Sequence, residues 1–364
     1  FKFRVRKFMK LFKSLLVAPA TLGLLAPMAA TANEVTINDF NAAEEIALTN
    51  SRVDGLEARL NNFEAGSFSE TTAASFSIDT VLGGIDGASS ETTSFDFQFN
   101  IGLATSFTGD DSLDIAIDNG SATLSPLGSK MGFDSGTSLV VDGVTYTFPV
   151  GGATVVVGDS TDISSTFTGA CVYSAFTDAT PDDCGTGNSL GVGGKGVTAS
   201  VGYAFDSGFS LAGGISSPQS EIVGDAADLF GIEAAYSADN YGLAFAIVSD
   251  DKDDNTTWGI NGYYIPEGSF PSVSVGFESS ETSGTDSDGY FIGLTFPEVG
   301  PGSVNIAAAT TGLIPSNGTE TMIYEASYSY DFNDGMTVTP GIFIEEVENH
   351  DDLLGIAVKT SFSF

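Results

Sequence analysis

The sequence predicts an all-β protein: a sixteen-stranded antiparallel transmembrane β-barrel with a short N-terminal periplasmic helix. Three observations support this prediction. From Ser67 onward, apolar and polar residues alternate with a period of two, which is typical of strands with one apolar face. The links between these strands are short and long in turn. The chain ends with LLGIAVKTSFSF, an alternating strand with Phe362 and Phe364 on its apolar face.

The first 32 residues are predicted to be an upstream extension followed by a secretory signal peptide. Residues 1–8 precede the first methionine. Residues 9–32 combine a short basic start, an apolar run from Leu15 to Met28 and a small-x-small end at residues 30–32. This pattern indicates a cleaved signal and is too short for a membrane anchor. The mature protein is therefore expected to be exported.

The charge of the chain excludes one class of partner. Outside the predicted leader, 6 basic residues stand against 48 acidic ones, a formal net charge of −42. Such a surface repels nucleic acid and anionic lipid headgroups. The 28 Phe and 11 Tyr residues argue against disorder, and the 44 Gly residues suit a β-rich protein with many turns.

Residues 33–66 carry a helical pattern. Ile46, Val53 and Leu60 are seven residues apart, and this spacing lasts for two and a half heptads. That length is marginal for an isolated helix or a coiled coil. Two interpretations stay open: a single helix docked at the periplasmic mouth of the barrel, or a short parallel bundle that joins three subunits.

The barrel domain is predicted to cover residues 67–364. An even number of strands is what single-chain outer-membrane barrels have. The links after even-numbered strands are short, and most links after odd-numbered strands are longer, including 119–138, 159–195 and 281–289. Short turns on one side and long loops on the other are typical of outer-membrane barrels. The predicted strands are 70–82, 93–107, 112–118, 139–149, 153–158, 196–205, 209–217, 229–237, 241–249, 256–265, 270–280, 288–297, 302–313, 321–331, 336–346 and 352–364.

The two faces of these strands differ in polarity. In FDFQFNI, Phe95, Phe97 and Phe99 alternate with polar residues. A wall with lipid outside and a water-filled pore inside needs this arrangement. The register predicts nine charged side chains that line the pore: Asp79, Asp96, Asp114, Asp118, Glu233, Glu278, Glu325, Glu345 and Lys359.

Two cysteines, Cys171 and Cys184, lie in the long link 159–195. In an exported chain they are predicted to form a disulfide, with two free thiols as the alternative. The bridge would stiffen a loop that has little core of its own. The same link holds Asp162, Asp178, Asp182, Asp183 and Lys195.

Three features resemble the cyanobacterial outer-membrane porins: RVDGLEARLNNFEAGSFSETT (52–72) leading into the first strand, YTFPVGG (146–152), and the C-terminal phenylalanine. The resemblance covers about residues 50–364. It implies a trimeric diffusion channel for small solutes, in a group with relatives linked to inorganic ions, including iron, or placed near carbohydrate-selective porins. Such relatives usually carry a surface-layer-homology domain ahead of the helix, and residues 33–50 leave no room for one.

In trimeric porins the loop after the fifth strand folds into the lumen and narrows it. The resemblance therefore implies that link 159–195 forms the constriction, with an outer lid over the mouth as the alternative. The constriction would consist of Asp162, Asp178, Asp182, Asp183 and Lys195. Several carboxylates around one narrow passage favour cations, so the pore is expected to be cation-preferring.

The predicted function is passive diffusion of small hydrophilic solutes and ions through an outer-membrane porin. No catalysis, cofactor or metal site is expected, because His350 is the single histidine and no serine is placed to work with it. Expected partners are outer-membrane lipid, two further copies in a homotrimer and the assembly machinery, which would recognise Phe362 and Phe364. The alternative is an exported β-rich adhesin or extracellular matrix protein that is not a channel.

Overall fold

The computed structural model describes residues 72–89, 91–122, 125–136, 138–219, 222, 228–251 and 254–364. The predicted leader, residues 1–32, and the predicted helix within residues 33–66 lie outside these ranges. In the described part of the chain, no helix has the length and apolar character needed to span a membrane.

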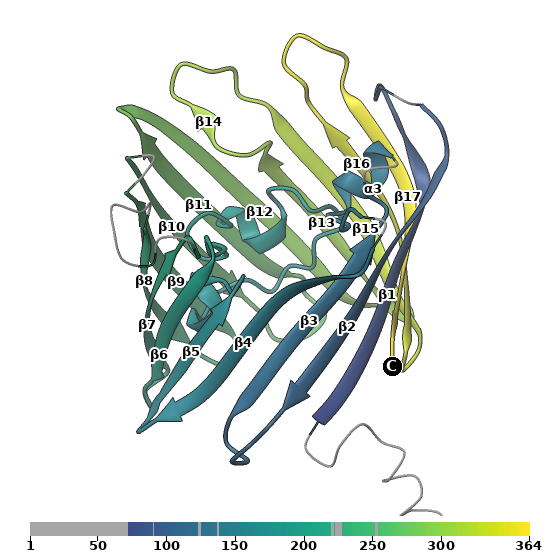
Figure 1. Ribbon diagram of the computed structural model, residues 1–364. Helices are drawn as coiled ribbons and strands as arrows, with labels where there is room; N and C mark the ends of the chain where they lie inside the picture. Colours follow the sequence, from purple (N-terminus) through teal and green to yellow (C-terminus); the bar gives the residue numbers. More distant parts are fainter. Residues whose placement is uncertain are drawn as a thin grey trace, which may run out of the picture. The chain divides into compact units, whose positions relative to one another are not determined.

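Sixteen long strands form one closed antiparallel sheet, which confirms the predicted architecture (Figure 1). All sixteen lie within a few residues of their predicted positions. A further two-residue strand, β14 (Ile314–Pro315), pairs with β12 in an outer link. The long strands are β1 (Thr72–Asp86), β2 (Ser94–Thr105), β3 (Ser112–Gly120), β4 (Val140–Val150), β5 (Ala153–Asp159), β6 (Val197–Ala204), β7 (Phe209–Ser217), β8 (Leu229–Ser237), β9 (Tyr241–Asp250), β10 (Asn255–Tyr264), β11 (Ser272–Thr282), β12 (Thr285–Val299), β13 (Gly302–Thr310), β15 (Met322–Asn333), β16 (Met336–Glu345) and β17 (Leu353–Ser363).

The barrel closes where β1 pairs with β17, with Ile78 opposite Phe362. The backbone N–H of Phe364 donates to the carbonyl of Phe76 at 3.0 Å, and the N–H of Phe76 donates back at 2.9 Å. The two rings stack with centroids 5.9 Å apart. Closure satisfies backbone groups that an open sheet edge would leave without partners.

Phe364→Asp is expected to impair assembly, because it replaces the stacked ring at this seam with a carboxylate. Phe270→Asp is the matched control, since Phe270 is 69% exposed and Phe364 is 74% exposed, but Phe270 lies in a turn away from the seam. The measurement is the amount of each protein in the outer membrane that migrates faster unheated than boiled. Equal amounts for the two variants would contradict the role of the seam.

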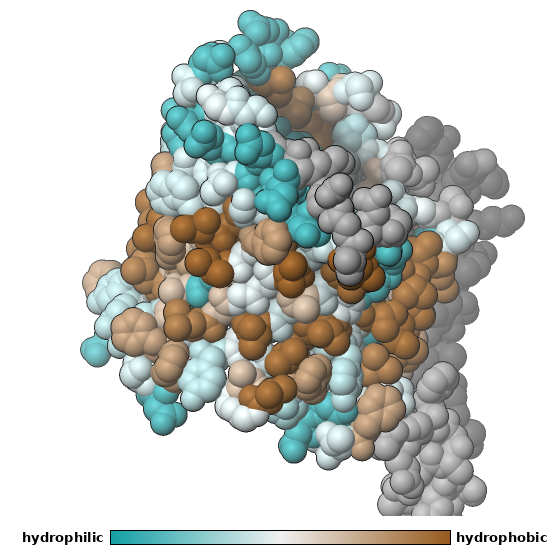
Figure 2. All heavy atoms as spheres, turned by 60° about the vertical axis from the view of Figure 1, so that its left-hand side comes forward, coloured by the Kyte–Doolittle hydropathy of each residue, from teal (hydrophilic) through white to brown (hydrophobic). Residues whose placement is uncertain are grey.

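The outer surface of the barrel is apolar. In β8, Ile232 is 65% exposed on the outer face, whereas its neighbour Glu233 is 3% exposed on the inner face. Figure 2 shows a band of apolar side chains across one side of the molecule, with hydrophilic side chains above it. This is the surface polarity that a wall in contact with lipid tails requires.

A short helix, α3 (Pro126–Lys130), lies inside the barrel near its upper rim (Figure 1). Ser125 caps it, because its Oγ accepts the N–H of Gly128 at 3.1 Å. The sequence places the link 119–138 outside, but its apolar residues pack against the inner faces of β1, β16 and β17. This buried cluster consists of Val81, Ile85, Ala122, Leu127, Met131, Phe133, Phe176, Phe343 and Ala357.

The prediction of a long link at residues 281–289 is wrong. β11 and β12 continue through it to a two-residue turn, Ser283 and Gly284, with φ values of 52° and 80°. Two positive φ values are what a tight type I′ hairpin needs. The Ser, Thr, Asp and Gly residues of this segment suggested a loop. Apart from the two turn residues, they belong to β11 and β12, whose pairing continues up to Thr282 opposite Thr285.

Candidate pore constriction

The long link after β5 lies inside the barrel, along its inner wall. It contains two 3-10 turns, η4 (Ile163–Thr166) and η5 (Asp182–Gly185). We call residues 160–196 the lumen loop. Its side chains and backbone contact inward-facing residues of β8, β10, β11 and β15, as described below. The lumen loop is therefore an internal element and not a lid over the mouth.

Glycines in the wall let the lumen loop lie close against the strands. A Cβ added at Gly276 would stand 1.8 Å from the carbonyl oxygen of Cys184, and one at Gly259 would stand 2.0 Å from Ser189 Oγ. At Gly341, an added Cβ would lie 2.6 Å from the ring of Phe176. Such distances leave no room for a side chain. Glycine at these inner positions therefore lets the lumen loop pack directly against the backbone of the strands.

Glu325 of β15 accepts four hydrogen bonds from the lumen loop. Its Oε1 accepts from the Tyr173 hydroxyl at 2.9 Å and the Phe176 N–H at 2.8 Å. Its Oε2 accepts from the N–H and the hydroxyl of Thr177 at 3.1 and 2.6 Å. Four donors from three loop residues, all within the stretch 173–177, converge on one carboxylate.

Other wall residues hold the rest of the lumen loop. Glu278 of β11 accepts from Asn188 Nδ2 at 2.8 Å and from Ser189 Oγ at 2.6 Å. Glu233 of β8 accepts the N–H of Thr168 at 3.1 Å. On β10, Asn261 Oδ1 accepts the N–H of Ala170 at 2.9 Å. The loop is thus attached to the wall along most of its length.

These contacts correct part of the predicted pore lining. Asp96, Asp118, Glu233, Glu278 and Glu325 do lie on the inner face, but their exposed fractions are only 1, 7, 3, 1 and 3%. The lumen loop covers the three glutamates, and Ser125, at the start of α3, donates to Asp96 at 2.5 Å. Asp96 and the three glutamates hold internal segments, and all five carboxylates are almost fully buried. Asp79, Asp114, Glu345 and Lys359 are half-buried on the inner face.

A disulfide joins Cys171 to Cys184, with Cα atoms 5.9 Å apart. Cys184 is fully buried against the wall. The bridge closes the segment that carries three of the predicted constriction acids, so this segment is held by a covalent bond as well as by Glu325.

Asp162, Asp178, Asp182 and Asp183 are exposed on the lumen loop, and we call them the acidic edge. The last three line a cavity of about 400 Å³ together with Asn188. Partial burial, with Asp183 and then Asp178 adding, raises the pKa of Asp182 to about 6. Burial and Asp178 also raise the pKa of Asp183. Mutual repulsion among these groups shows that their charges act on one small volume.

Two further acids, which the sequence analysis missed, are Asp134 in the link 119–138 and Asp142 of β4. Burial raises the pKa of Asp134, and Asp142 adds to it. Burial also raises the pKa of Asp162, where the Gly194 N–H opposes the rise and Asp142 and Asp183 add to it. Asp142 therefore acts on an acid of the link 119–138 and on an acid of the lumen loop. Asp142 is the extra residue of a β-bulge in β4, because Ala116 pairs with Gly143 and Ile117 pairs with Val141, so strict alternation fails there. The Asp-Gly pair at 142–143 is the signal in the sequence that marks this break.

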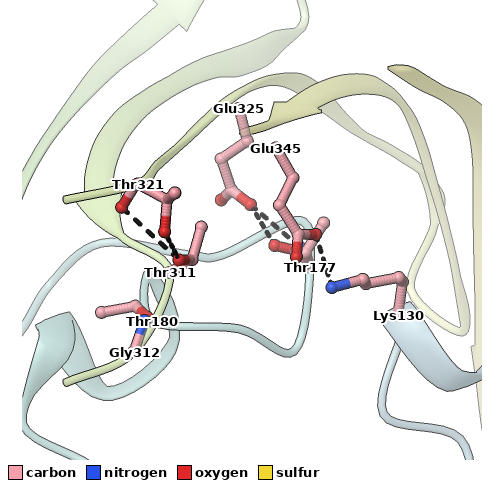
Figure 3. A network of polar contacts seen from close by, with 8 residues as sticks. All are labelled: Lys130, Thr177, Thr180, Thr311, Gly312, Thr321, Glu325 and Glu345. Carbon is pink, nitrogen blue, oxygen red and sulfur yellow. Dashed lines mark hydrogen bonds and ion pairs between the residues drawn. The ribbon is translucent and has the colours of Figure 1, made fainter. Parts of the chain in front are cut away.

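Three lysines occur in the described part of the barrel, and two form ion pairs. Lys130 pairs with Glu345, as Figure 3 shows beside the contact between Thr177 and Glu325. Lys195, predicted to belong to the constriction, pairs with Asp250 and borders a separate cavity of about 730 Å³ with Asp162. Lys359, from the inner face of β17, slightly lowers the pKa of Asp182, so it lies near the acidic edge.

Comparisons with known proteins agree with this barrel. No family model matches the chain. It is 30% identical over 165 residues to an uncharacterized protein of Nostoc sp.; the match covers 40% of the chain and 28% of that relative's length. Among solved structures, an engineered variant of the Rh. blastica porin matches with a TM-score of 0.55 and 17% identity, over 80% of this chain and 100% of that one. A loop-deletion variant of OmpT, an outer membrane protein of Vibrio cholerae, matches with a TM-score of 0.59 and 11% identity, over 81% and 99%. These structural matches show the fold.

Proposed function

We propose that this protein is an outer-membrane porin, through which small hydrophilic solutes and ions diffuse passively. The observation that carries the proposal is the closed sixteen-stranded barrel with an apolar outer face, a polar inner face and an internal loop. A wall of this polarity is stable with lipid outside and water within. A loop attached to the inner wall narrows the passage through the barrel without closing it.

Within this proposal, the pore prefers cations. The acidic edge, Asp142 and Asp134 form a connected set of carboxylates, since Asp142 acts on both Asp134 and Asp162, and Asp183 acts on Asp162. Two of the three described lysines are neutralised by ion pairs. A low-dielectric wall focuses the field of the remaining charges, so cations are concentrated in the passage and anions are repelled.

The inner wall favours ions and general polar solutes over sugars. A sugar-selective passage benefits from exposed aromatic faces against which the apolar faces of a pyranose ring pack. The inward-facing aromatic residues of the described strands are Tyr263, Phe291 and Phe343, as the strand register and burial indicate. Phe291 and Phe343 are only 3 and 0% exposed. Of the inward-facing aromatic residues in the described strands, Tyr263 alone is half-exposed, so these strands offer carbohydrates no extended aromatic platform.

The proposed setting is the outer membrane of a Gram-negative-type envelope, with membrane lipid around the barrel. The proposed assembly is a homotrimer, as in many porins, and the assembly machinery would recognise β17 with its aromatic residues Phe362 and Phe364. Chemical cross-linking of the purified protein in detergent tests the number of subunits.

A single-channel recording in a planar bilayer tests the proposal. The purified protein is expected to produce stepwise conductance, with a reversal potential across a potassium chloride gradient that has the sign of a cation-selective pore. Liposome swelling should decline steadily with solute size, without a preference for sugars. An adhesin or matrix protein would show no conductance and no difference in gel mobility between unheated and boiled samples.

A further inference from the structure

We infer that Glu325 is the positioning residue of the acidic edge: it determines where Asp178 stands in the pore and is not itself a charge that permeating ions encounter. The inference rests on the proposed function as a channel. Glu325 is one of the acids that the strand register assigned to the pore lining, and the structure gives it a different role.

The first argument is the environment of the carboxylate. Glu325 is 3% exposed, and each of its two oxygens accepts two hydrogen bonds from the lumen loop. Charge-assisted hydrogen bonds of this kind are roughly twice as strong as neutral ones. A carboxylate that is saturated by donors and covered by the loop is shielded from ions in the passage.

The second argument is where these hydrogen bonds act along the chain. They end at Thr177, and the next residue is Asp178 of the acidic edge. The N–H of Asp178 donates to the carbonyl of Lys130 at 2.9 Å, and Thr180 Oγ1 accepts the N–H of Gly312 at 2.7 Å. Figure 3 shows the side chains of Glu325 and Thr177 directed toward each other, with Thr180 beside Gly312. The backbone that carries Asp178 is therefore held on both sides.

The third argument is a comparison among the wall glutamates. Glu278 receives side-chain donors from Asn188 and Ser189, five or more residues beyond Asp183. Glu233 holds Thr168, ten residues before Asp178. Of these three glutamates, Glu325 is the one whose loop partners lie nearest in sequence to Asp178, since Thr177 directly precedes it.

Two substitutions separate a positioning role from a charge role. Glu325→Gln keeps the shape, removes the charge and turns an acceptor into a donor that faces Thr177. Thr177→Val keeps every charge and removes the 2.6 Å hydrogen bond to Glu325. Thr168→Val is the matched control, because Thr168 contacts its wall glutamate through the backbone N–H, which valine retains.

The readout is single-channel conductance and reversal potential at low salt and in 1 M potassium chloride, where the Debye length is about 3 Å. If Glu325 positions the loop, both Glu325→Gln and Thr177→Val change the conductance in 1 M salt by about twofold with added current fluctuation, because screening does not restore geometry. Thr168→Val should match the wild type.

Other outcomes overturn the inference. If Glu325→Gln acts only at low salt and Thr177→Val has no effect, Glu325 is a pore charge. If Glu325→Gln fails to assemble, Tyr173→Phe and Thr177→Val replace it, because both leave the wall unchanged. A changed conductance in 1 M salt for these two variants supports the positioning role, and an unchanged conductance overturns it. A wild type without conductance would instead refute the proposed porin function, so the two failures are distinct.

Discussion

Gly276→Val is expected to displace the lumen loop and to change single-channel conductance more than any conservative change on the outer face. The Cβ of a residue at this position would lie 1.8 Å from the carbonyl oxygen and 3.0 Å from the carbonyl carbon of Cys184. Both atoms belong to the backbone of a segment held by a disulfide, so neither can rotate away. Overpacking of a filled site commonly costs about 1–3 kcal/mol. The loop must therefore leave its seat, or the wall must deform.

The measurement is conductance in 1 M potassium chloride, after gel mobility of the unheated protein has shown that the barrel is closed. Gly213→Val is the matched control, because Gly213 also lies within a strand but a Cβ there would meet its nearest atom at 3.4 Å. The control is expected to keep wild-type conductance. An unchanged conductance for Gly276→Val would mean that the lumen loop does not limit the passage.

The second large effect is expected from a triple change of Asp178, Asp182 and Asp183 to Asn. A unit charge about 5 Å from an ion in bulk water contributes about 0.8 kcal/mol, roughly a fourfold enrichment of a cation relative to a neutral solute. The potassium-to-chloride permeability ratio should therefore fall by at least about fourfold at low salt, and by much less where screening is strong. Reversal potentials across a salt gradient measure this ratio. An unchanged permeability ratio would indicate that Asp134 and Asp142, and not these three aspartates, determine the selectivity.

Lowering the pH tests the contribution of the acidic edge to cation preference without a substitution. Because the pKa of Asp182 is raised to about 6, this group binds a proton at higher pH than an ordinary aspartate does. The cation preference of the wild type should decline as the pH falls from 7.5 to 5, since Asp182 loses its charge within that range. Asp182→Asn should show a flatter profile from the start. A steeper profile in the variant would contradict the assignment.

The strands could be predicted from sequence because each residue of a barrel wall faces either lipid or lumen. Ile232 and Glu233 illustrate this constraint, since adjacent positions carry opposite polarity. The strand number and the pairing of β1 with β17 follow from the same alternation. Alternation also indicated the inner face for Glu325 and Lys359.

Alternation cannot reveal what covers an inner-facing residue. Glu325 and Asp79 have the same inner-facing register, yet one is closed off by Tyr173, Phe176 and Thr177 and the other is half-buried. The placement of α3 inside the barrel depends on packing between Leu127 and distant residues of β1 and β16. The sequence analysis missed Asp142 because a β-bulge interrupts the period of two on which the prediction of inward-facing residues rests.

The anchors of the lumen loop have a consequence for the order of folding. The loop follows β5, but Thr177 and its partner Glu325 are 148 residues apart in the chain. Contacts between such distant residues form late, because the intervening chain must be ordered first. The lumen loop therefore cannot take its final position before β15, far along the chain, is in place. A barrel whose loop had not reached these anchors would have a wider passage, so the selectivity proposed for this pore depends on contacts made after more than half of the barrel strands have been synthesised.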